Sequence, residues 1–304
     1  MSGDLEEQRA ELIERWERGA AGWGARAAEI RAFGMPVSVW LLDALAPQPG
    51  QRVLDLAAGP GDTGFMAAEL IRQPDDSRAV RSGEAGGRAD GMRAGTLITS
   101  DAAEGMLEVA RARAGELGID NVEFKRLELE WIDLPTASVD AAVCRWGLML
   151  ILDPAAAAQE VRRVLRPGGR FALAVWDRGE LNPWATIPTR ALVELGHAPP
   201  PDPTAPAGMF ALAAPGALKE LLYGAGFQDV TLGQVELERT NASVAEYVQE
   251  TADLSKLFGD VLGRLGERER AELLAAIERG LEPFTLPDGS IRLPARSLVA
   301  AATA

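Results

Sequence analysis

The chain has 304 residues, of which 31 are Lys or Arg and 45 are Asp or Glu, so its formal net charge is −14 with the single histidine neutral. Apolar residues make up 47% and charged residues 25%, a balance that excludes a disordered or fibrous chain. The acidic charge argues against nucleic acid as a partner, and the single cysteine, Cys144, excludes a disulfide framework and a cysteine-rich metal site.

Residues 5–46 are predicted to form helices, because apolar residues recur there at helical spacing. Several glycines are expected to break these helices into short pieces: Gly19, Gly22, Gly24 and Gly34. We interpret residues 1–46 as a helical cap and residues 47–304 as the main domain.

From residue 52 onward, short apolar runs alternate with helical patterns, which is typical of a parallel sheet covered by helices on both faces. A glycine-rich turn follows the first run and leads into a helix at 65–72, with Asp62 or Thr63 as its cap. Residues 73–95 contain almost no large apolar side chain and are predicted to form a mobile loop. The expected strands are 52–57, 97–100, 122–125, 141–144 and 171–176, and the helices between them are 104–117 and 154–165.

Residues 177–215 carry eight of the nineteen prolines, so we expect an irregular segment that serves as a lid. A helix at 216–223 and extended chain at 227–240 follow, then an insert at 241–287 with two helices and a last strand at 297–302. The whole pattern predicts an α/β fold with a Rossmann-like, seven-stranded, mostly parallel sheet.

The turn after the first strand is the first candidate site, because ligands of open parallel sheets bind beyond the carboxyl ends of the strands. Residues 59–64 fit the G-x-G-x-x-G pattern of dinucleotide-binding loops, which is weak on its own. Asp55, inside the preceding strand, is poorly suited to a pyrophosphate, whose negative charge such a loop must accept. Its carboxylate favours a cationic ligand and can hold the N–H groups of the loop.

Residues 53–61 (VLDLAAGPG) resemble motif I of the class I S-adenosylmethionine-dependent methyltransferases, with Ala57 in place of the first glycine. Three further segments resemble later motifs of that family in the expected order: 100–107 (SDAAEGML), 127–131 (LELEW) and 163–171 (RVLRPGGRF). Within the family, the chain is most similar to small-molecule methyltransferases of the ubiquinone and menaquinone biosynthesis group.

This resemblance implies S-adenosylmethionine as cofactor and S-adenosylhomocysteine as product. It also implies that Asp101 accepts the ribose hydroxyls and that Glu128, with the backbone N–H of Leu129, recognises the adenine. Asp101 is alternatively a helix cap, and Glu128 is alternatively a solvated acid on a turn. The residues expected to contact the cofactor are Asp55, Ala57, Gly59, Gly61, Asp101, Met106, Glu128, Leu129 and Arg145.

Arg145 and Trp146 directly follow the fourth strand, where this fold opens toward the transferable methyl group. They are expected to line the junction of cofactor and acceptor; alternatively, Trp146 lies in the core and Arg145 pairs with a surface acid. The candidate walls of an acceptor pocket are Trp23, Trp146, Trp176 and Trp184, which are alternatively core residues. His197 is a candidate general base or an inert loop residue.

The predicted function is transfer of a methyl group to a small, partly apolar metabolite by in-line displacement, for which the activated sulfonium requires mainly placement of the acceptor. Two alternatives stay open: a nicotinamide-dependent oxidoreductase that uses the same glycine loop, and a non-catalytic S-adenosylmethionine-binding protein. The acidic N-terminus lacks the basic flank and apolar stretch of a secretion signal, so we expect a cytoplasmic protein. We also expect no metal, no nucleic acid and no membrane as partners, and a homodimer is left open.

Overall fold

A seven-stranded sheet runs through the computed structural model, which describes residues 2–72, 94–202 and 205–304. Its strands are β1 (Arg52–Asp55), β2 (Thr96–Asp101), β3 (Val122–Arg126), β4 (Val139–Arg145), β5 (Leu165–Trp176), β6 (Gln228–Asn241) and β7 (Ile291–Thr303). The strand order is β3-β2-β1-β4-β5-β7-β6. β1 to β5 are parallel, whereas β7 is antiparallel to both of its neighbours. The predicted fold class is confirmed.

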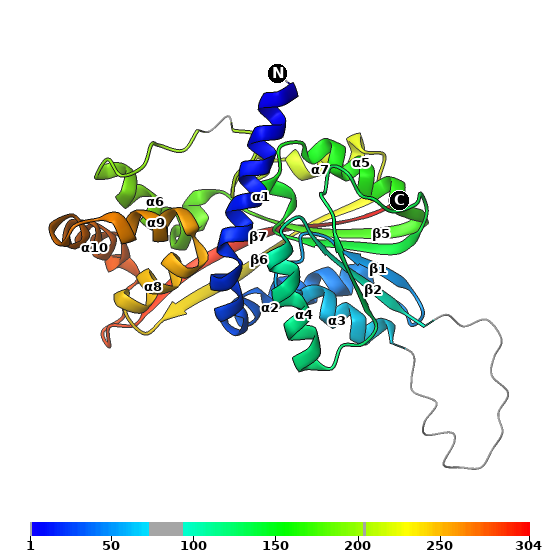
Figure 1. Ribbon diagram of the computed structural model, residues 1–304, viewed down its shortest axis with the longest axis horizontal. Coiled ribbons are helices and arrows are strands. Elements are labelled where there is room, and N and C mark those ends of the chain that lie inside the picture. The colour runs from blue at the N-terminus through cyan, green and yellow to red at the C-terminus, as the bar shows by residue number, and fades with distance from the viewer. Residues whose placement is uncertain (1, 73–93, 203–204) are drawn as a thin grey trace, which may run out of the picture.

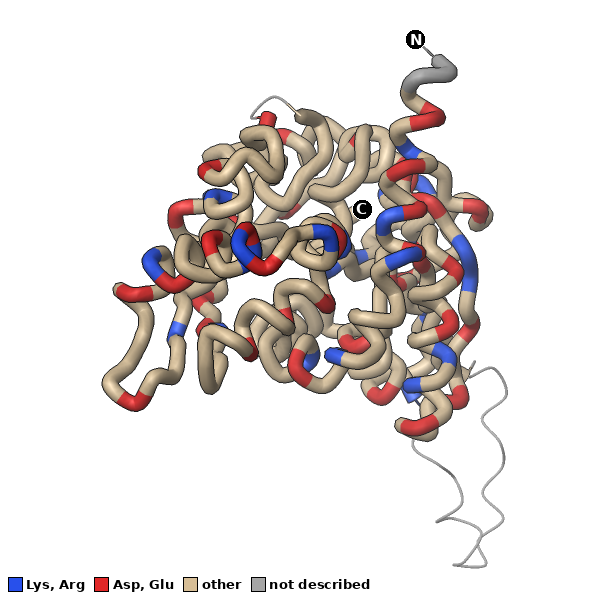
Figure 2. Tube along the Cα trace, turned by 60° about the vertical axis from the view of Figure 1, so that its left-hand side comes forward, with Lys and Arg blue, Asp and Glu red and all other residues tan. Residues whose placement is uncertain are grey.

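Helices lie on both sides of this sheet (Figure 1). They are α1 (Ser2–Ala25), α2 (Ala27–Leu45), α3 (Asp62–Ile71), α4 (Glu104–Leu117), α5 (Pro154–Val164), α6 (Pro183–Glu194), α7 (Ala217–Gly224), α8 (Val244–Leu254), α9 (Lys256–Arg264) and α10 (Glu267–Leu281). Charged residues of both signs are distributed over them (Figure 2). Among the described residues, every helix is too short or too polar to cross a membrane.

The core sits on the central strands, where apolar residues follow one another without alternation. Val53 and Leu54 of β1 are fully buried, as are Val143 and Cys144 of β4. Successive side chains of a strand point to opposite faces of the sheet. Because helices cover both faces of a parallel sheet, the side chains on both faces must be apolar. This explains why the runs at 52–57, 141–144 and 171–176 are recognisable as strands from the sequence, and Cys144 is a buried part of one of them.

The N-terminal glycines do not break the helices into short pieces, so that prediction is wrong. α1 is continuous through Gly19, Gly22 and Gly24, and the chain turns only at Arg26, between α1 and α2. A Cβ at Gly22 would lie 2.0 Å from the carbonyl oxygen of Asp253 in α8, so this glycine permits close helix packing. The packing compensates for the low helix propensity of glycine.

The C-terminal end of α1 is tied to α8. Arg26 donates to Oδ2 of Asp253 through Nε at 2.9 Å and Nη2 at 2.7 Å. The indole N–H of Trp23 donates to the carbonyl oxygen of Leu254 at 3.2 Å. Segments about 230 positions apart are thus joined at the edge of the helical insert.

The segment 177–215 is more regular than expected, because α6 forms inside it. Pro183 is the first residue of that helix, where a missing N–H costs nothing, and Pro188 is accommodated within it. The insert 241–287 holds α8, α9 and α10 where two helices were predicted, and β7 begins at Ile291, before the predicted 297. Residues 73–93 of the predicted loop lie outside the described residues.

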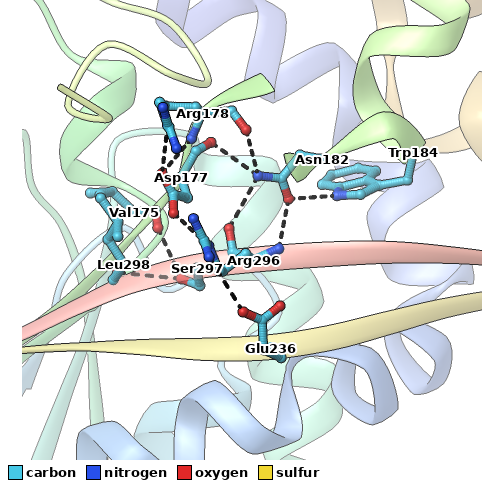
Figure 3. Close-up of polar contacts among 9 residues, drawn as sticks. All are labelled: Val175, Asp177, Arg178, Asn182, Trp184, Glu236, Arg296, Ser297 and Leu298. Atoms are coloured by element: carbon cyan, nitrogen blue, oxygen red, sulfur yellow. Dashed lines mark hydrogen bonds and ion pairs between the residues drawn. The ribbon is translucent and has the colours of Figure 1, made fainter. Parts of the chain in front are cut away.

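Asn182 fastens α6 to the sheet (Figure 3). Its side-chain N–H groups point to the carbonyl oxygens of Asp177, Arg178 and Arg296 at 3.0–3.2 Å. Its oxygen accepts from the backbone N–H of Arg296 at 3.0 Å and from the indole of Trp184 at 3.1 Å. Asn182 is fully buried, so these bonds satisfy groups that no solvent reaches.

Replacing Asn182 with alanine should lower the free energy of unfolding by about 3 kcal/mol, because several buried partners lose their hydrogen bonds at once. Urea unfolding followed by circular dichroism measures this change. The matched control is Gln249→Ala at an exposed position with one hydrogen bond to Asp253, for which a change within about 0.5 kcal/mol is expected. Equal stability of the two variants would contradict the anchoring role.

Candidate active site

A cavity lies at the carboxyl ends of the parallel strands and beneath α1. The loops that follow β1, β2, β3 and β4 line it, together with one face of α1. The predicted residues that line it are Trp23, Ala57, Gly59, Asp101, Met106, Glu128, Leu129, Arg145 and Trp146. Those that do not line it are Asp55, Gly61, Trp176, Trp184 and His197.

The turn after β1 has a left-handed backbone at several positions. Ala57 has φ 49° and Gly59 has φ 53°, a region that favours glycine. A Cβ at Gly59 would meet no atom within 4 Å, so the bare backbone faces the open cavity. Gly61, at φ 87°, is different, because a Cβ there would lie 2.5 Å from the ring of Phe65. Gly61 therefore serves the start of α3 rather than the cavity.

Asp101 joins the first two loops. Its Oδ2 accepts from the backbone N–H of Gly59 and its Oδ1 from that of Ala103, both at 3.0 Å. Burial raises the pKa of Asp101, and the backbone N–H donors oppose this rise. A carboxylate has about four acceptor positions, so two remain for a ligand. The local structural role and a ligand role are therefore compatible in one side chain.

Asp55 lies behind the loop and is 2% exposed. Its Oδ2 accepts from the backbone N–H of Gly64 at 3.0 Å, so it holds the first turn of α3 rather than the loop itself. Burial raises the pKa of Asp55 to about 7, and the positive charge of Arg145 offsets part of this rise. A Cβ at Gly64 would lie 2.3 Å from the carboxylate, so this contact requires a glycine.

Arg145 is part of a buried charge cluster. Its Nη2 lies 3.3 Å from Oδ2 of Asp62, and its Nη1 donates to Oγ of Ser38 at 3.1 Å. Asp62 also pairs with Arg113, at 2.7 Å. The prediction that Asp62 or Thr63 caps α3 is wrong: the cap residue is Gly61, and the Asp62 carboxylate turns to two guanidinium groups instead. The acid that pairs with Arg145 is thus buried and not on the surface.

Trp146 forms one wall of the cavity and is held from behind. Its ring stacks on that of Trp176 at a centroid distance of 4.2 Å, and Trp176 contacts Trp184 in turn at 5.0 Å. Its indole N–H donates to Oγ of Ser297 at 3.0 Å. These contacts hold Trp146 at φ 62°, which costs a non-glycine residue roughly 1–2 kcal/mol. Trp176 and Trp184 support this wall rather than line the cavity.

Residues 47–190, which contain these loops, match the family model described as a methyltransferase domain. This part of the chain is a methyltransferase domain of the class I S-adenosylmethionine-dependent kind. S-Adenosylmethionine is its cofactor and S-adenosylhomocysteine its product, as the sequence resemblance implied. The α1 and α2 helices and the insert with α8 to α10 lie outside the matched residues.

Relatives of this methyltransferase include enzymes that act on small molecules. The chain is 29% identical over 215 residues to nocamycin O-methyltransferase from Saccharothrix syringae, with 68% of this chain and 69% of the relative covered. It is 30% identical over 141 residues to the ubiquinone/menaquinone biosynthesis C-methyltransferase UbiE from Caulobacter vibrioides. That match covers 46% of this chain and half of the relative's length.

The fold is shared with solved structures at low sequence identity. The YcgJ protein from Bacillus subtilis superimposes with a TM-score of 0.53 at 18% identity, over 88% of this chain and 97% of that one. This similarity extends beyond the matched domain and supports the seven-stranded architecture.

The contribution of α1 to the cavity was missed by the sequence reasoning, apart from Trp23. Arg9, Leu12, Ile13 and Trp16 also line it. Their spacing at positions 9, 12, 13 and 16 marks one helical face, a signal that was available in the sequence. His197 follows α6, where its backbone N–H donates to the carbonyl oxygen of Leu192. We assign this histidine no role in the reaction.

The raised pKa of Asp55 predicts a pH-dependent stability. The folded protein binds this proton more tightly than the unfolded chain, so the stabilisation is present below the ordinary pKa of 3.8 and is lost as pH rises through about 7. Relative to Asp55→Asn, the unfolding free energy of the wild type should fall over this window by at most about 1.4 kcal/mol per pH unit. Urea unfolding between about pH 5 and pH 8 measures this difference.

Asp120→Asn controls for the loss of one carboxylate, since the side chain of Asp120 is 83% exposed. A difference between the wild type and Asp55→Asn that stays constant across the window would contradict the raised pKa.

Proposed function

We propose that this methyltransferase binds S-adenosylmethionine in the cavity at the ends of β1 to β4 and transfers its methyl group to a small, partly apolar metabolite. The observation that carries this proposal is the convergence of the glycine loop, Asp101 and Glu128 on one cavity. These groups come from three separate strands and the loops that follow them. They are also the groups that the family resemblance assigns to binding of the methyl donor.

The chemistry of the donor fits these residues. S-Adenosylmethionine carries a sulfonium and an ammonium against one carboxylate, so its net positive charge suits a cavity lined by acids. The unused acceptor positions of Asp101 can take the ribose hydroxyls. Glu128 and the buried Leu129 lie on the next loop, and in this proposal they contact the adenine. Met106 is 2% exposed and provides an apolar surface beside that place.

We place the acceptor beside Trp146, on the part of the cavity formed by the segment that follows β4. Trp146 is joined there by Leu150, Ile151 and Leu152, which follow β4. The bound donor supplies an already activated methyl group, so the chain has to place the acceptor in line and exclude water. An apolar wall does both for a partly apolar substrate. The names of the O- and C-methyltransferase relatives support a small-molecule acceptor.

The helical cap 1–46 is the part that we propose as a lid, because α1 lines the cavity. The proposed lid at 177–215 has weaker support, since none of its described residues lines the cavity. The net charge of −14 supports an acceptor other than nucleic acid. A cytoplasmic location and a homodimer are compatible with this proposal, which requires neither.

Isothermal titration with S-adenosylmethionine tests the donor site. The wild type should bind it, and Asp101→Asn should bind about 100-fold more weakly, because the amide puts a donor where the ribose hydroxyls and the Gly59 N–H need acceptors. The matched control, Asp133→Asn, changes an exposed acid on the loop after β3 and should bind like the wild type. Tight binding of NAD with no heat from S-adenosylmethionine would favour the oxidoreductase alternative.

Turnover is tested with the isotopically labelled methyl donor and a metabolite extract. The expected result is a labelled small-molecule product that the Asp101→Asn variant forms more slowly. Donor binding without any labelled product from a broad set of extracts would support the non-catalytic alternative.

A further inference from the structure

α1 presents one helical face to the cavity. Leu12, Ile13 and Trp16 line it from above, and Trp16 and Trp23 pack on the small cluster of Ala20, Ala103 and Met106. α1 lies beside α4 along this contact (Figure 1). The helix is thus a structural part of the cavity, although it lies outside the residues that match the methyltransferase domain.

Arg9 connects this helix to the loop after β3. Its Nε lies 3.7 Å from Oε2 of Glu128, and its Nη2 lies 3.5 Å from Oε1 of Glu130. All three side chains line the cavity. The Nε atom of Arg9 is buried and makes no hydrogen bond within the described part of the chain, so the ion pair with Glu128 is the interaction of this atom.

Glu17, two turns further along α1, connects it to the start of α4. Its Oε1 accepts from the backbone N–H of Gly105 at 3.0 Å. The cap residue of α4 is Ala103, which has no side-chain acceptor, so Glu17 supplies the carboxylate that this helix start lacks. The same turn is bound on its other side by Asp101, through the N–H of Ala103.

We propose that Arg9 and Glu17 are positioning residues of the donor site: α1 holds Glu128 and the first turn of α4 in the arrangement that binds the adenosyl group. This inference rests on the proposed donor site. Arg9 acts by charge, because Glu128 and Glu130 would otherwise repel each other and the half-exposed Glu128 would turn to solvent. Glu17 acts by fixing the backbone next to Asp101.

S-Adenosylhomocysteine is the probe, since its binding by titration calorimetry needs no knowledge of the acceptor. Arg9→Gln should weaken its affinity about tenfold, and Arg9→Lys, which keeps the charge, should recover most of the loss. The matched control is Arg15→Gln, an exposed arginine on the same helix, which should bind within about twofold of the wild type. Glu17→Ala should weaken binding about threefold, with Glu14→Ala, 69% exposed, as its control.

A double-variant cycle separates positioning from mere stability of the helix. If Arg9 acts through Glu128, the Arg9→Gln change should cost almost nothing further in a Glu128→Gln background. Additive losses, or an Arg9→Gln variant that binds like the wild type, would overturn the inference. A wild type that does not bind S-adenosylhomocysteine would overturn the proposed donor site and this inference with it. Unchanged circular dichroism spectra establish that the compared variants are folded.

Discussion

The arrangement of the cavity depends on the carboxylate of Asp101, which stands at the end of β2. It accepts one backbone N–H from the loop after β1 and another from the turn that begins α4. Two neighbouring loops of a parallel sheet have no strand pairing to align them beyond the strand ends. A buried side chain with four acceptor positions performs that task here, and its remaining capacity faces the cavity.

A cluster of buried charged side chains lies behind the loops that Asp101 connects. Asp62 stands between Arg113 and Arg145, and Asp55 lies beside Arg145 while it holds the start of α3. Buried charges are tolerated only when they are paired and hydrogen-bonded, and most of these groups meet that condition. The cluster connects the helices α2, α3 and α4 to the strands β1 and β4. It therefore holds these helices against the strands whose loops line the cavity.

Much of the domain 47–190 could be predicted, because its signals are local. Fully buried strands such as β1 and β4 are continuous apolar runs, and motif glycines such as Gly59 mark a turn whose backbone needs positive φ. The errors arose where a distant partner decides the outcome. Gly22 lies within a continuous helix and lets α8 pack closely against it, and the carboxylate of Asp62 pairs with Arg113 and Arg145 instead of capping α3. The sequence pattern marked the apolar face of α1 but did not indicate which surface that face would cover.

The hydrogen bonds from Trp23 and Arg26 to α8 connect the N-terminal helix to the insert between β6 and β7. The same helix also lines the cavity. Helices outside the shared domain are where a methyltransferase can diversify its choice of substrate while its core stays the same. In this chain such diversification is constrained, since any rearrangement of α8 would also displace α1, which lines the cavity. A chimera in which α8 to α10 are replaced by the helices of another enzyme would therefore also need the α1 of that enzyme.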